Sequence, residues 1–201
     1  MFPEEILGEL LIFIVGKSGS GKDTLMREST RLLKEKKVPI TVLQRFITRI
    51  SDKNEDSIFI TEDDFLKRKE KNEFALAWFI FGNWYGISRE SIETLIKRGE
   101  IGLVNVSRSI LHKAKESYPL CKIVLIDVPI SIIKERVRSR GRDMGKGYED
   151  RLVRMQEEDI DMPPPDKIIV NDRNVEKAVN ELSTYIEYLY NTKYRKIRIG
   201  S

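Results

Sequence analysis

The sequence predicts an α/β fold of three layers, in which a parallel core sheet is flanked by helices. Short continuous apolar runs, typical of strands buried on both faces, alternate along the chain with segments of helical periodicity. The first apolar run ends in a glycine-rich loop that leads into a helix. With 201 residues, the chain is long enough for one domain with a sizeable core.

The first half of the chain contains the elements that frame this loop. Residues 10–15 form an apolar strand that ends at Gly16, and residues 22–36 form a helix. The inner face of that helix is expected to carry Leu25, Met26, Leu32 and Leu33. Residues 39–46 read as a second strand, 61–74 as a helix with a Thr N-cap, and 73–87 as strands around a Gly-Asn turn.

The second half continues the alternation of strands and helices. Ser88 begins a helix that Gly99 ends. The remaining expected elements are strands at 101–106, 122–128 and 166–172 and helices at 131–141, 148–160 and 175–191.

Composition favours a soluble globular protein that handles an anionic small molecule. Charged residues make up 34% of the chain, and the net charge of +4 is too mild to call for nucleic acid. Cys121 is the only cysteine, so neither a disulfide framework nor a Cys/His metal site is expected. His112 reads as a surface helix residue without an obvious partner. The apolar run at 10–15 is too short for a membrane span and follows glutamates, so we expect a cytoplasmic protein.

The segment GKSGSGKDT closely matches a P-loop, G-x-x-x-x-G-K followed by Ser or Thr. It lies between a strand and a helix, where backbone N–H groups and the helix N-terminus together bind phosphate. A glycine-rich turn without a ligand is the less favoured alternative. The expected nucleotide-binding residues are Gly16, Lys17, Ser18, Gly19, Ser20, Gly21, Lys22, Asp23 and Thr24.

Asp23 departs from the motif because it stands where a hydroxyl should bind magnesium. A carboxylate beside a triphosphate is repelled, but it is also a hard oxygen ligand suited to Mg²⁺. With the cation between them, repulsion becomes bridging. Thr24 supplies a hydroxyl one residue later. Both residues are therefore candidate metal ligands.

An arginine-rich segment lies between the predicted strands at 122–128 and 166–172. Arg136 and Arg140 fall on one helical face, and Arg151 lies nearby. Such a cluster can clamp the charge of a transferring phosphoryl group, and the glycines around it would allow it to move as a lid. An ordinary basic surface helix is the alternative.

Several segments together resemble the guanylate kinases. GNWYGISRESIETLIKRGEIGLVNVS (82–107) is similar to that family's G-N-Y-Y-G-T-S and following helix, and FITR (46–49) to its T-T-R segment. Residues 136–152 resemble its lid and 168–172 its closing strand. The resemblance, which covers residues 10 to about 186, implies a single domain with the fold of P-loop nucleoside monophosphate kinases. Its core would lie at about 10–44, 89–135 and 152–190, a small acceptor-binding region at about 45–88, and a mobile lid at about 136–151.

The acceptor region lacks the guanine-reading residues of that family. Leu76 stands where guanylate kinases have the glutamate that reads the base, and Ile87 replaces a hydroxyl residue. The acidic strand end L-D-I-D becomes VNVS, with Asn105 and Ser107. A site without these partners would discriminate guanine poorly.

The combination of a kept phosphate site and a lost base site resembles the ribose 1,5-bisphosphate phosphokinases. Their P-loops read G-x-S-G-S-G-K-D, as here, and their acceptor motifs resemble ITR (47–49), ALAW (75–78), LVNVSR (103–108) and RGRD (140–143). The resemblance implies that ATP phosphorylates ribose 1,5-bisphosphate to phosphoribosyl pyrophosphate, with ADP as the second product.

The same resemblance implies a set of roles. The backbone of 16–22 and Lys22 would hold the β- and γ-phosphates of ATP, and Mg²⁺ would bridge them with Asp23 or Thr24 in its shell. Arg136, Arg140 and Arg151 would close over the γ-phosphoryl group. The expected acceptor-binding residues are Arg45, Arg49, Tyr85, Asn105, Ser107 and Arg108.

Simpler interpretations remain open for some of these residues. Arg45 can be a surface strand residue, Tyr85 and Trp78 can be packing residues, and Asn105 and Ser107 can cap the next segment. For the whole chain, the alternatives are a guanylate or other nucleoside monophosphate kinase and a non-catalytic binding module of guanylate kinase shape. A nucleic-acid end kinase is less favoured, because neither a strongly basic groove nor a general base stands out. The partner would be a small sugar bisphosphate or nucleotide, and the protein a monomer or homodimer.

Overall fold

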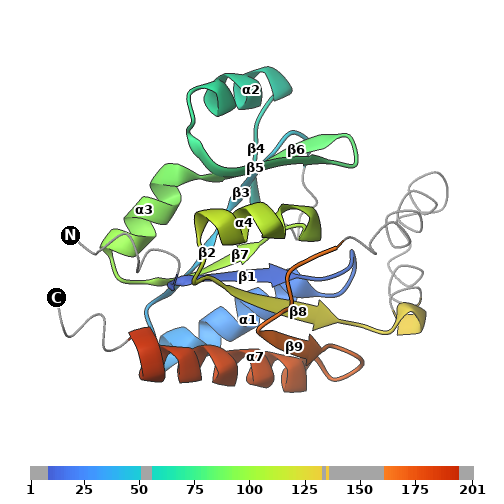
Figure 1. The fold of residues 1–201 in the computed structure, drawn as a ribbon. Coiled ribbons are helices and arrows are strands. Elements are labelled where there is room, and N and C mark those ends of the chain that lie inside the picture. Colours follow the sequence, from blue (N-terminus) through green and yellow to red (C-terminus); the bar gives the residue numbers. More distant parts are fainter. Residues whose placement is uncertain (1–8, 51–55, 133–134, 136–160, 195–201) are drawn as a thin grey trace.

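The computed structural model describes residues 9–50, 56–132, 135 and 161–194, and it confirms the α/β fold (Figure 1). The strands are β1 (Leu11–Val15), β2 (Ile40–Leu43), β3 (Arg45–Ile47), β4 (Ser57–Phe59), β5 (Phe74–Ile80), β6 (Asn83–Ser88), β7 (Ile101–Asn105), β8 (Lys122–Asp127) and β9 (Lys167–Val170). The helices are α1 (Lys22–Glu35), α2 (Glu62–Glu70), α3 (Arg89–Lys97), the 3₁₀ turn η2 (Arg108–Ile110), α4 (Leu111–Ser117), α7 (Val175–Leu189) and the π-helical turn η3 (Tyr190–Tyr194).

The main sheet has five parallel strands in the order β2-β7-β1-β8-β9. Every residue of β1 and β7 is buried, which agrees with their continuous apolar sequences. Helices α1 and α7 lie below the sheet in Figure 1, and α3 and α4 lie above it. Because all five strands are parallel, their carboxyl ends meet at one edge, where ligands of open α/β sheets bind.

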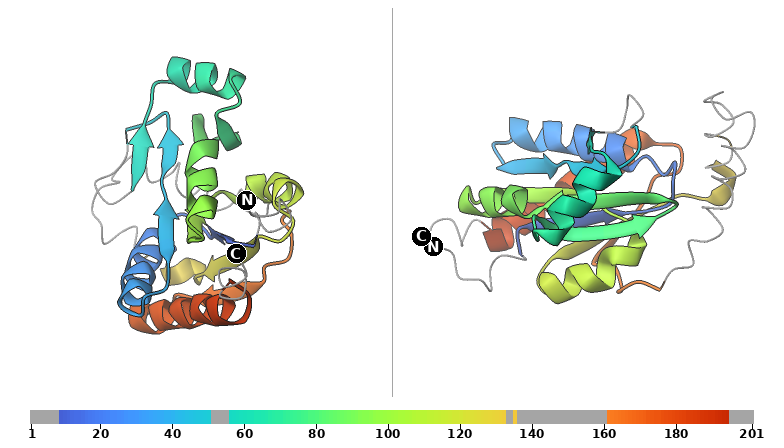
Figure 2. Two further views of the ribbon diagram at one scale, coloured as in Figure 1. Left: turned by 90° about the vertical axis from the view of Figure 1, so that its left-hand side faces the viewer. Right: turned by 90° about the horizontal axis from the view of Figure 1, so that it is seen from above.

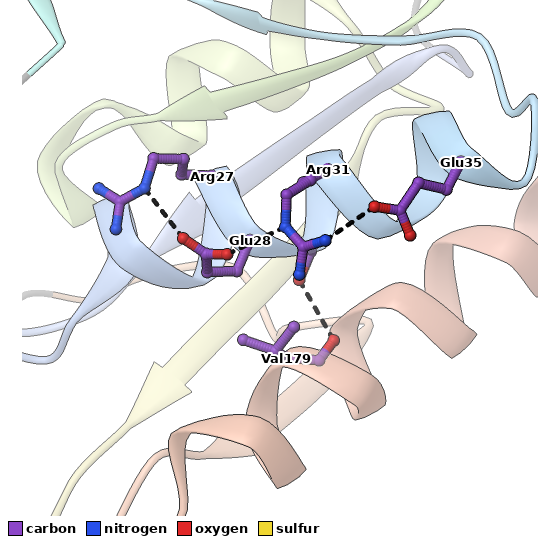
Figure 3. Close-up of polar contacts among 6 residues, drawn as sticks. Arg27, Glu28, Arg31, Glu35 and Val179 are labelled. Atoms are coloured by element: carbon purple, nitrogen blue, oxygen red, sulfur yellow. Dashed lines mark hydrogen bonds and ion pairs between the residues drawn. The ribbon is translucent and has the colours of Figure 1, made fainter.

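Helix α1 is held against α7, as Figure 3 shows. The Ser29 hydroxyl donates a hydrogen bond of 3.2 Å to the Val179 carbonyl, and Leu25, Met26 and Leu33 are buried as expected. Leu32 is only half-buried, whereas Ser29 and Thr30, which were not expected on the inner face, are buried. The outer face of α1 carries Arg27, Glu28, Arg31 and Glu35 in a run of exposed ion pairs.

A second sheet of four strands stands above the main one (Figure 2, left), in the order β4-β3-β6-β5. The Phe65 side chain of α2 stacks on Phe74, with ring centroids 4.4 Å apart, and also on Trp84. The opposite face of the β5–β6 hairpin carries Leu76, Trp78 and Ile87 into the main core. The hairpin thus joins two apolar clusters.

The prediction of one strand over residues 39–46 is wrong. Residues Ile40–Leu43 pair with β7 in the main sheet, whereas Arg45–Ile47 pair with β4 and β6 in the second sheet. The break falls at Gln44, which is exposed. The local sequence continues the strand pattern across this residue, so only the distant pairing partners determine the break. Strand β4 was not anticipated, and the η2–α4 segment was anticipated only in so far as His112 was expected on a surface helix.

Several local signals are confirmed. The turn of the β5–β6 hairpin lies at Phe81 and Gly82, one residue before the expected Gly-Asn turn, and their φ angles of 51° and 72° suit a tight two-residue connection. Thr61 and Ser88 cap α2 and α3, because their hydroxyl oxygens accept hydrogen bonds from the N–H groups of Asp64 and Ser91. Helix α2 ends at Glu70, four residues before the expected end.

The single cysteine and the single histidine differ in their surroundings. Cys121 is buried, and this burial raises the pKa of its thiol to about 11, so it behaves as a core residue. His112 lies on α4 with an exposed side chain, as expected, but its Nε2 is 3.3 Å from a carboxylate oxygen of Asp161, a partner that the sequence did not reveal. No helix within the described ranges is both long and apolar enough to cross a membrane.

Candidate active site

The glycine-rich loop connects the carboxyl end of β1 to α1, which is the context that a P-loop requires. Gly21 is the N-cap of α1 and has a left-handed conformation with φ 86°. The Ser20 N–H donates to the Lys17 carbonyl at 3.0 Å, which closes the loop into a tight turn. The backbone therefore curls as an anion-binding loop does, directly before a helix N-terminus.

Two glycines of the loop are required by close contacts. A Cβ atom at Gly16 would lie 2.4 Å from the Ile126 carbonyl oxygen of β8. A Cβ atom at Gly21 would lie 2.6 Å from Nδ2 of Asn171. The loop is thus fixed against the ends of both β8 and β9, with no room for larger residues.

The Lys22 ammonium group lies over the loop. It donates hydrogen bonds to the carbonyl oxygens of Gly16, at 2.5 Å, and of Lys17, at 3.0 Å, and lies 3.5 Å from the Ser20 hydroxyl. These contacts hold the positive charge of Lys22 on the loop itself. The contact of Lys22 with phosphate groups stays a prediction.

Asn171 was not singled out in the sequence, yet it supports the loop. Its side chain is 2% exposed, and its Nδ2 donates a 2.7 Å hydrogen bond to the Ser20 carbonyl. Its backbone N–H donates to the Asp127 carbonyl of β8 at 2.8 Å. The clue in the sequence was a polar residue close to the end of the last predicted strand (166–172), because the carboxyl ends of parallel strands meet at the sheet edge that also carries the P-loop.

Asp23, in the first turn of α1, contacts Asn105 at the end of β7. Nδ2 of Asn105 donates a 2.8 Å hydrogen bond to Oδ1 of Asp23. Asn105 is 6% exposed, whereas Asp23 is exposed to the solvent. The structure therefore brings together a candidate metal ligand and a candidate acceptor residue, and Asn105 does not cap the segment that follows it.

Asp23 and Thr24 can contribute oxygen ligands to a cation that arrives with a triphosphate. Mg²⁺ in kinase sites is typically bound by one or two protein oxygens together with phosphate oxygens. Within the described residues, no group of three or more His, Cys, Asp or Glu could hold a metal ion.

The candidate acceptor residues of the second sheet gather around Tyr85. The Arg45 guanidinium lies over the Tyr85 ring, 5.9 Å from its centroid. The Trp78 ring is stacked with the Tyr85 ring, with centroids 5.5 Å apart. Trp78 is buried and belongs to the core, as the packing interpretation had it. Tyr85 is half-buried, and Arg49 lies two residues beyond the end of β3.

Ser107 and Arg108 lie just beyond β7. The Ser107 hydroxyl accepts a 3.3 Å hydrogen bond from the Ser109 N–H, so Ser107 is the N-cap of η2. Arg108 is the first residue of that turn and is half-buried. The capping interpretation thus describes Ser107 in this structure, and both residues remain close in sequence to Asn105.

A groove of about 490 Å³ runs between α1 and β2 and begins at the Asp23–Asn105 contact. Arg45 lies on its wall, but Arg49, Tyr85, Ser107 and Arg108 do not line it. The sequence singled out Met26 only as a core residue of the first helix. It did not single out the other lining residues, which are Arg27, Thr30, Arg31, Lys34, Thr41, Val42, Leu43 and Asp56. Their spacing along α1, three or four residues apart, is the signal that would have found this face.

The positions where guanylate kinases read their base are filled by core side chains. Leu76 and Ile87 face each other across β5 and β6, and both are 0% exposed. Both belong to the main hydrophobic cluster. The expected lid over 136–151, with Arg136, Arg140 and Arg151, and the expected helix at 148–160 lie outside the described residues.

Comparison with known proteins places this geometry in a family. A family model described as "Guanylate kinase" matches residues 9–189. A "Ribose 1,5-bisphosphate phosphokinase PhnN" of Desulfomicrobium baculatum is 40% identical over 76% of this chain and 81% of its own length. Proteins of the same name from Burkholderia mallei and Pectobacterium atrosepticum are 34% and 30% identical, over 73% and 89% of this chain and 78% and 94% of theirs. A crystal structure of guanylate kinase from Anaplasma phagocytophilum matches with a TM-score of 0.62 at 21% identity, covering 94% of this chain and 89% of that one.

Proposed function

The chain belongs to the guanylate kinase family of phosphotransferases, and we propose that it is a ribose 1,5-bisphosphate phosphokinase. In this reaction, an oxygen of the C1 phosphate forms a bond to the γ-phosphorus of ATP. The bond between that phosphorus and the oxygen bridging to the β-phosphate breaks, so that ADP leaves and 5-phosphoribosyl 1-pyrophosphate forms. The attacking oxygen is already ionised, so no general base is needed.

The observation that carries this proposal is the burial of Leu76 and Ile87. Both side chains are 0% exposed in the core, so neither position offers a polar partner to the edge of a guanine base. At the same time, the loop around Lys22 keeps the geometry of a phosphate site. A kinase that binds phosphates but lacks these base partners fits a sugar phosphate acceptor, and curated relatives carry the corresponding name.

The groove beside Asp23 supports the same acceptor class. Arg27 lies on its α1 wall and Arg45 on its β3 wall, so it carries positive charge on two sides. Among the described residues that line it, none is aromatic, which leaves no ring on which a base could stack. At one end, Oδ1 of Asn105 can accept a hydrogen bond from a sugar hydroxyl while its Nδ2 donates to Asp23.

Catalysis by these residues would consist of positioning and charge neutralisation. The loop N–H groups and Lys22 would bind the β- and γ-phosphates, and Arg45, Arg49 and Tyr85 the acceptor phosphates. Mg²⁺, held by Asp23 and Thr24 together with phosphate oxygens, would neutralise negative charge on ATP. Arg136, Arg140 and Arg151 would close over the γ-phosphoryl group as part of a lid at about 136–151, next to an acceptor-binding region at about 45–88.

Phosphorus NMR tests the proposal. Purified protein would be incubated with Mg-ATP and, in separate reactions, with ribose 1,5-bisphosphate, GMP, dGMP, AMP, UMP and CMP. We expect a new diphosphate signal, other than that of ADP, only with the ribose bisphosphate. Turnover of GMP instead would overturn the proposal in favour of a guanylate kinase.

A pair of lysine variants separates catalysis from mere binding. Lys22→Ala removes the ammonium group of the loop and should reduce turnover by about 10²–10³-fold, the cost of losing one preorganised charge contact in the transition state. Lys177→Ala, on the exposed surface of α7, is the matched control and should leave turnover unchanged. Equal activity in both variants would contradict a catalytic P-loop.

A further inference from the structure

The hydrogen bond between Asn105 and Asp23 links two elements that are far apart in sequence. Asn105 is the last residue of β7 and pairs in register with Ile14 of β1, the strand that leads into the P-loop. Its amide is almost fully buried and donates to Oδ1 of Asp23 at 2.8 Å. The carboxylate of Asp23 is thereby tied to the rigid core rather than left to rotate on an exposed helix turn.

A neutral amide is suited to this position. An amide donates a hydrogen bond to the carboxylate without cancelling its negative charge, so Asp23 remains a strong ligand for a cation. A second carboxylate at position 105 would repel the first one across the same distance. An apolar side chain would leave Asp23 free to adopt other rotamers.

We propose that Asn105 is a positioning residue for Asp23. Its hydrogen bond holds Oδ1 of Asp23 against the core, so that Oδ2 would be left to bind the divalent cation that accompanies the triphosphate. This inference rests on the proposed function, in so far as the phosphate loop must bind a metal–triphosphate complex. Groups that hydrogen-bond to metal ligands typically change metal affinity by about 10–100-fold when they are lost. Asn105 would therefore act on metal binding through Asp23.

Manganese binding is the direct test, because it has a readout that does not depend on turnover. Free Mn²⁺ would be measured by electron paramagnetic resonance during titration of protein and ATP at equal concentrations, against the same titration of ATP alone and in the absence of any acceptor. Asn105→Leu and Asn105→Asp should each weaken Mn²⁺ binding by about 10–100-fold. The control Asn174→Asp, at the N-cap of α7, keeps the side-chain oxygen that accepts from the Lys177 N–H and should bind Mn²⁺ like the parent.

A double-mutant cycle separates positioning from an independent role. Asp23→Asn should also weaken Mn²⁺ binding, and adding Asn105→Leu to it should cost little more, because the carboxylate to be oriented is already gone. The exchanged variant Asp23→Asn/Asn105→Asp keeps one amide and one carboxylate in contact, so it should fold like the parent while still binding Mn²⁺ weakly. Its fold would be checked by circular dichroism.

Two results would overturn the inference. Parent-like Mn²⁺ affinity in Asn105→Leu, with a raised KM for the acceptor, would show that Asn105 serves the acceptor and not the metal. Parent-like affinity in the exchanged variant would show that the position of the carboxylate does not matter. Because no acceptor is present, turnover of GMP would overturn the proposed function without affecting this test, whereas failure of the parent to bind Mn²⁺ with ATP would contradict both.

Discussion

Asn171 shows at the scale of one residue how the core shapes the phosphate loop. Its buried amide donates to the Ser20 carbonyl, and its backbone is anchored to β8 through the Asp127 carbonyl. Because Asn171 binds the Ser20 carbonyl on the core side of the loop, the loop can turn its N–H groups toward an anion. The side chain also occupies the space next to Gly21.

Asn171→Asp should therefore damage both stability and donor binding. The exchange keeps the shape of the side chain but places a carboxylate oxygen against the Ser20 carbonyl. Loss of this buried hydrogen bond should lower the free energy of unfolding by about 1–3 kcal/mol. We also expect the KM for ATP to rise by about tenfold, equivalent to about 1.4 kcal/mol, with little change in the KM for the acceptor. Urea denaturation and steady-state kinetics would measure the two effects, and an unchanged KM for ATP would contradict the role in the loop.

The residues of the phosphate loop were predictable from the sequence, whereas the hydrogen bonds that hold them were not. The P-loop residues 16–24 are recognised by their type and spacing, because the motif is local. The Asn105–Asp23 and Asn171–Ser20 hydrogen bonds join residues 82 and 151 positions apart, respectively. No local pattern encodes such pairs; they follow from parallel strand ends meeting at one edge of the sheet.

At the scale of elements, features set by neighbouring residues were predictable, and features set by distant pairing partners were not. The caps of α2 and α3 and the turn at Phe81–Gly82 were predictable, since each depends on a few neighbouring residues. The break at Gln44 was not, because β2 and β3 differ only in the strands with which they pair. The three residues of β4 were missed for the same reason.

The β5–β6 hairpin offers a test of how an element carries a binding residue. A Cβ atom at Gly86 would lie 2.7 Å and 2.8 Å from ring atoms of Phe74 and 3.0 Å from Phe65. The two rings are stacked and leave little space to move. Gly86→Ala should therefore destabilise the protein by about 1–3 kcal/mol through overpacking.

The kinetic effect of Gly86→Ala should fall on one substrate. Tyr85 is the neighbour of Gly86 in β6, whereas the P-loop belongs to the main sheet. We expect the KM for ribose 1,5-bisphosphate to rise more than the KM for ATP, which serves as the internal control. Chemical denaturation would report the loss of stability, and equal increases in both KM values would show that the hairpin has no special connection to the acceptor.

At the scale of the whole molecule, the candidate site draws its residues from two sheets. Lys22, Asp23 and Asn105 belong to the main sheet and its first helix, whereas Arg45 and Tyr85 belong to the second sheet. The donor should therefore contact mainly one sheet, and the acceptor both. An acceptor that contacts both sheets would therefore raise the free energy of unfolding of the whole domain.

Thermal denaturation can detect this bridging. At about 100 times its dissociation constant, a ligand adds about 2.7 kcal/mol to the free energy of unfolding. For a chain of this length, each kcal/mol raises the Tm by about 2–4 °C, so ribose 1,5-bisphosphate should raise it by about 5–10 °C. GMP at the same concentration should raise the Tm less, because the buried apolar side chains of Leu76 and Ile87 offer no hydrogen bond to the guanine base.

The variant Arg45→Ala assigns the stabilisation to the acceptor site. Arg45 lines the groove from the second sheet and lies against Tyr85, so its loss should remove most of the Tm increase caused by ribose 1,5-bisphosphate. The increase caused by Mg-ATP should persist, because the P-loop residues are untouched. A variant that loses both increases would point to general damage. One that loses neither would place the acceptor away from the groove, on residues of the main sheet alone.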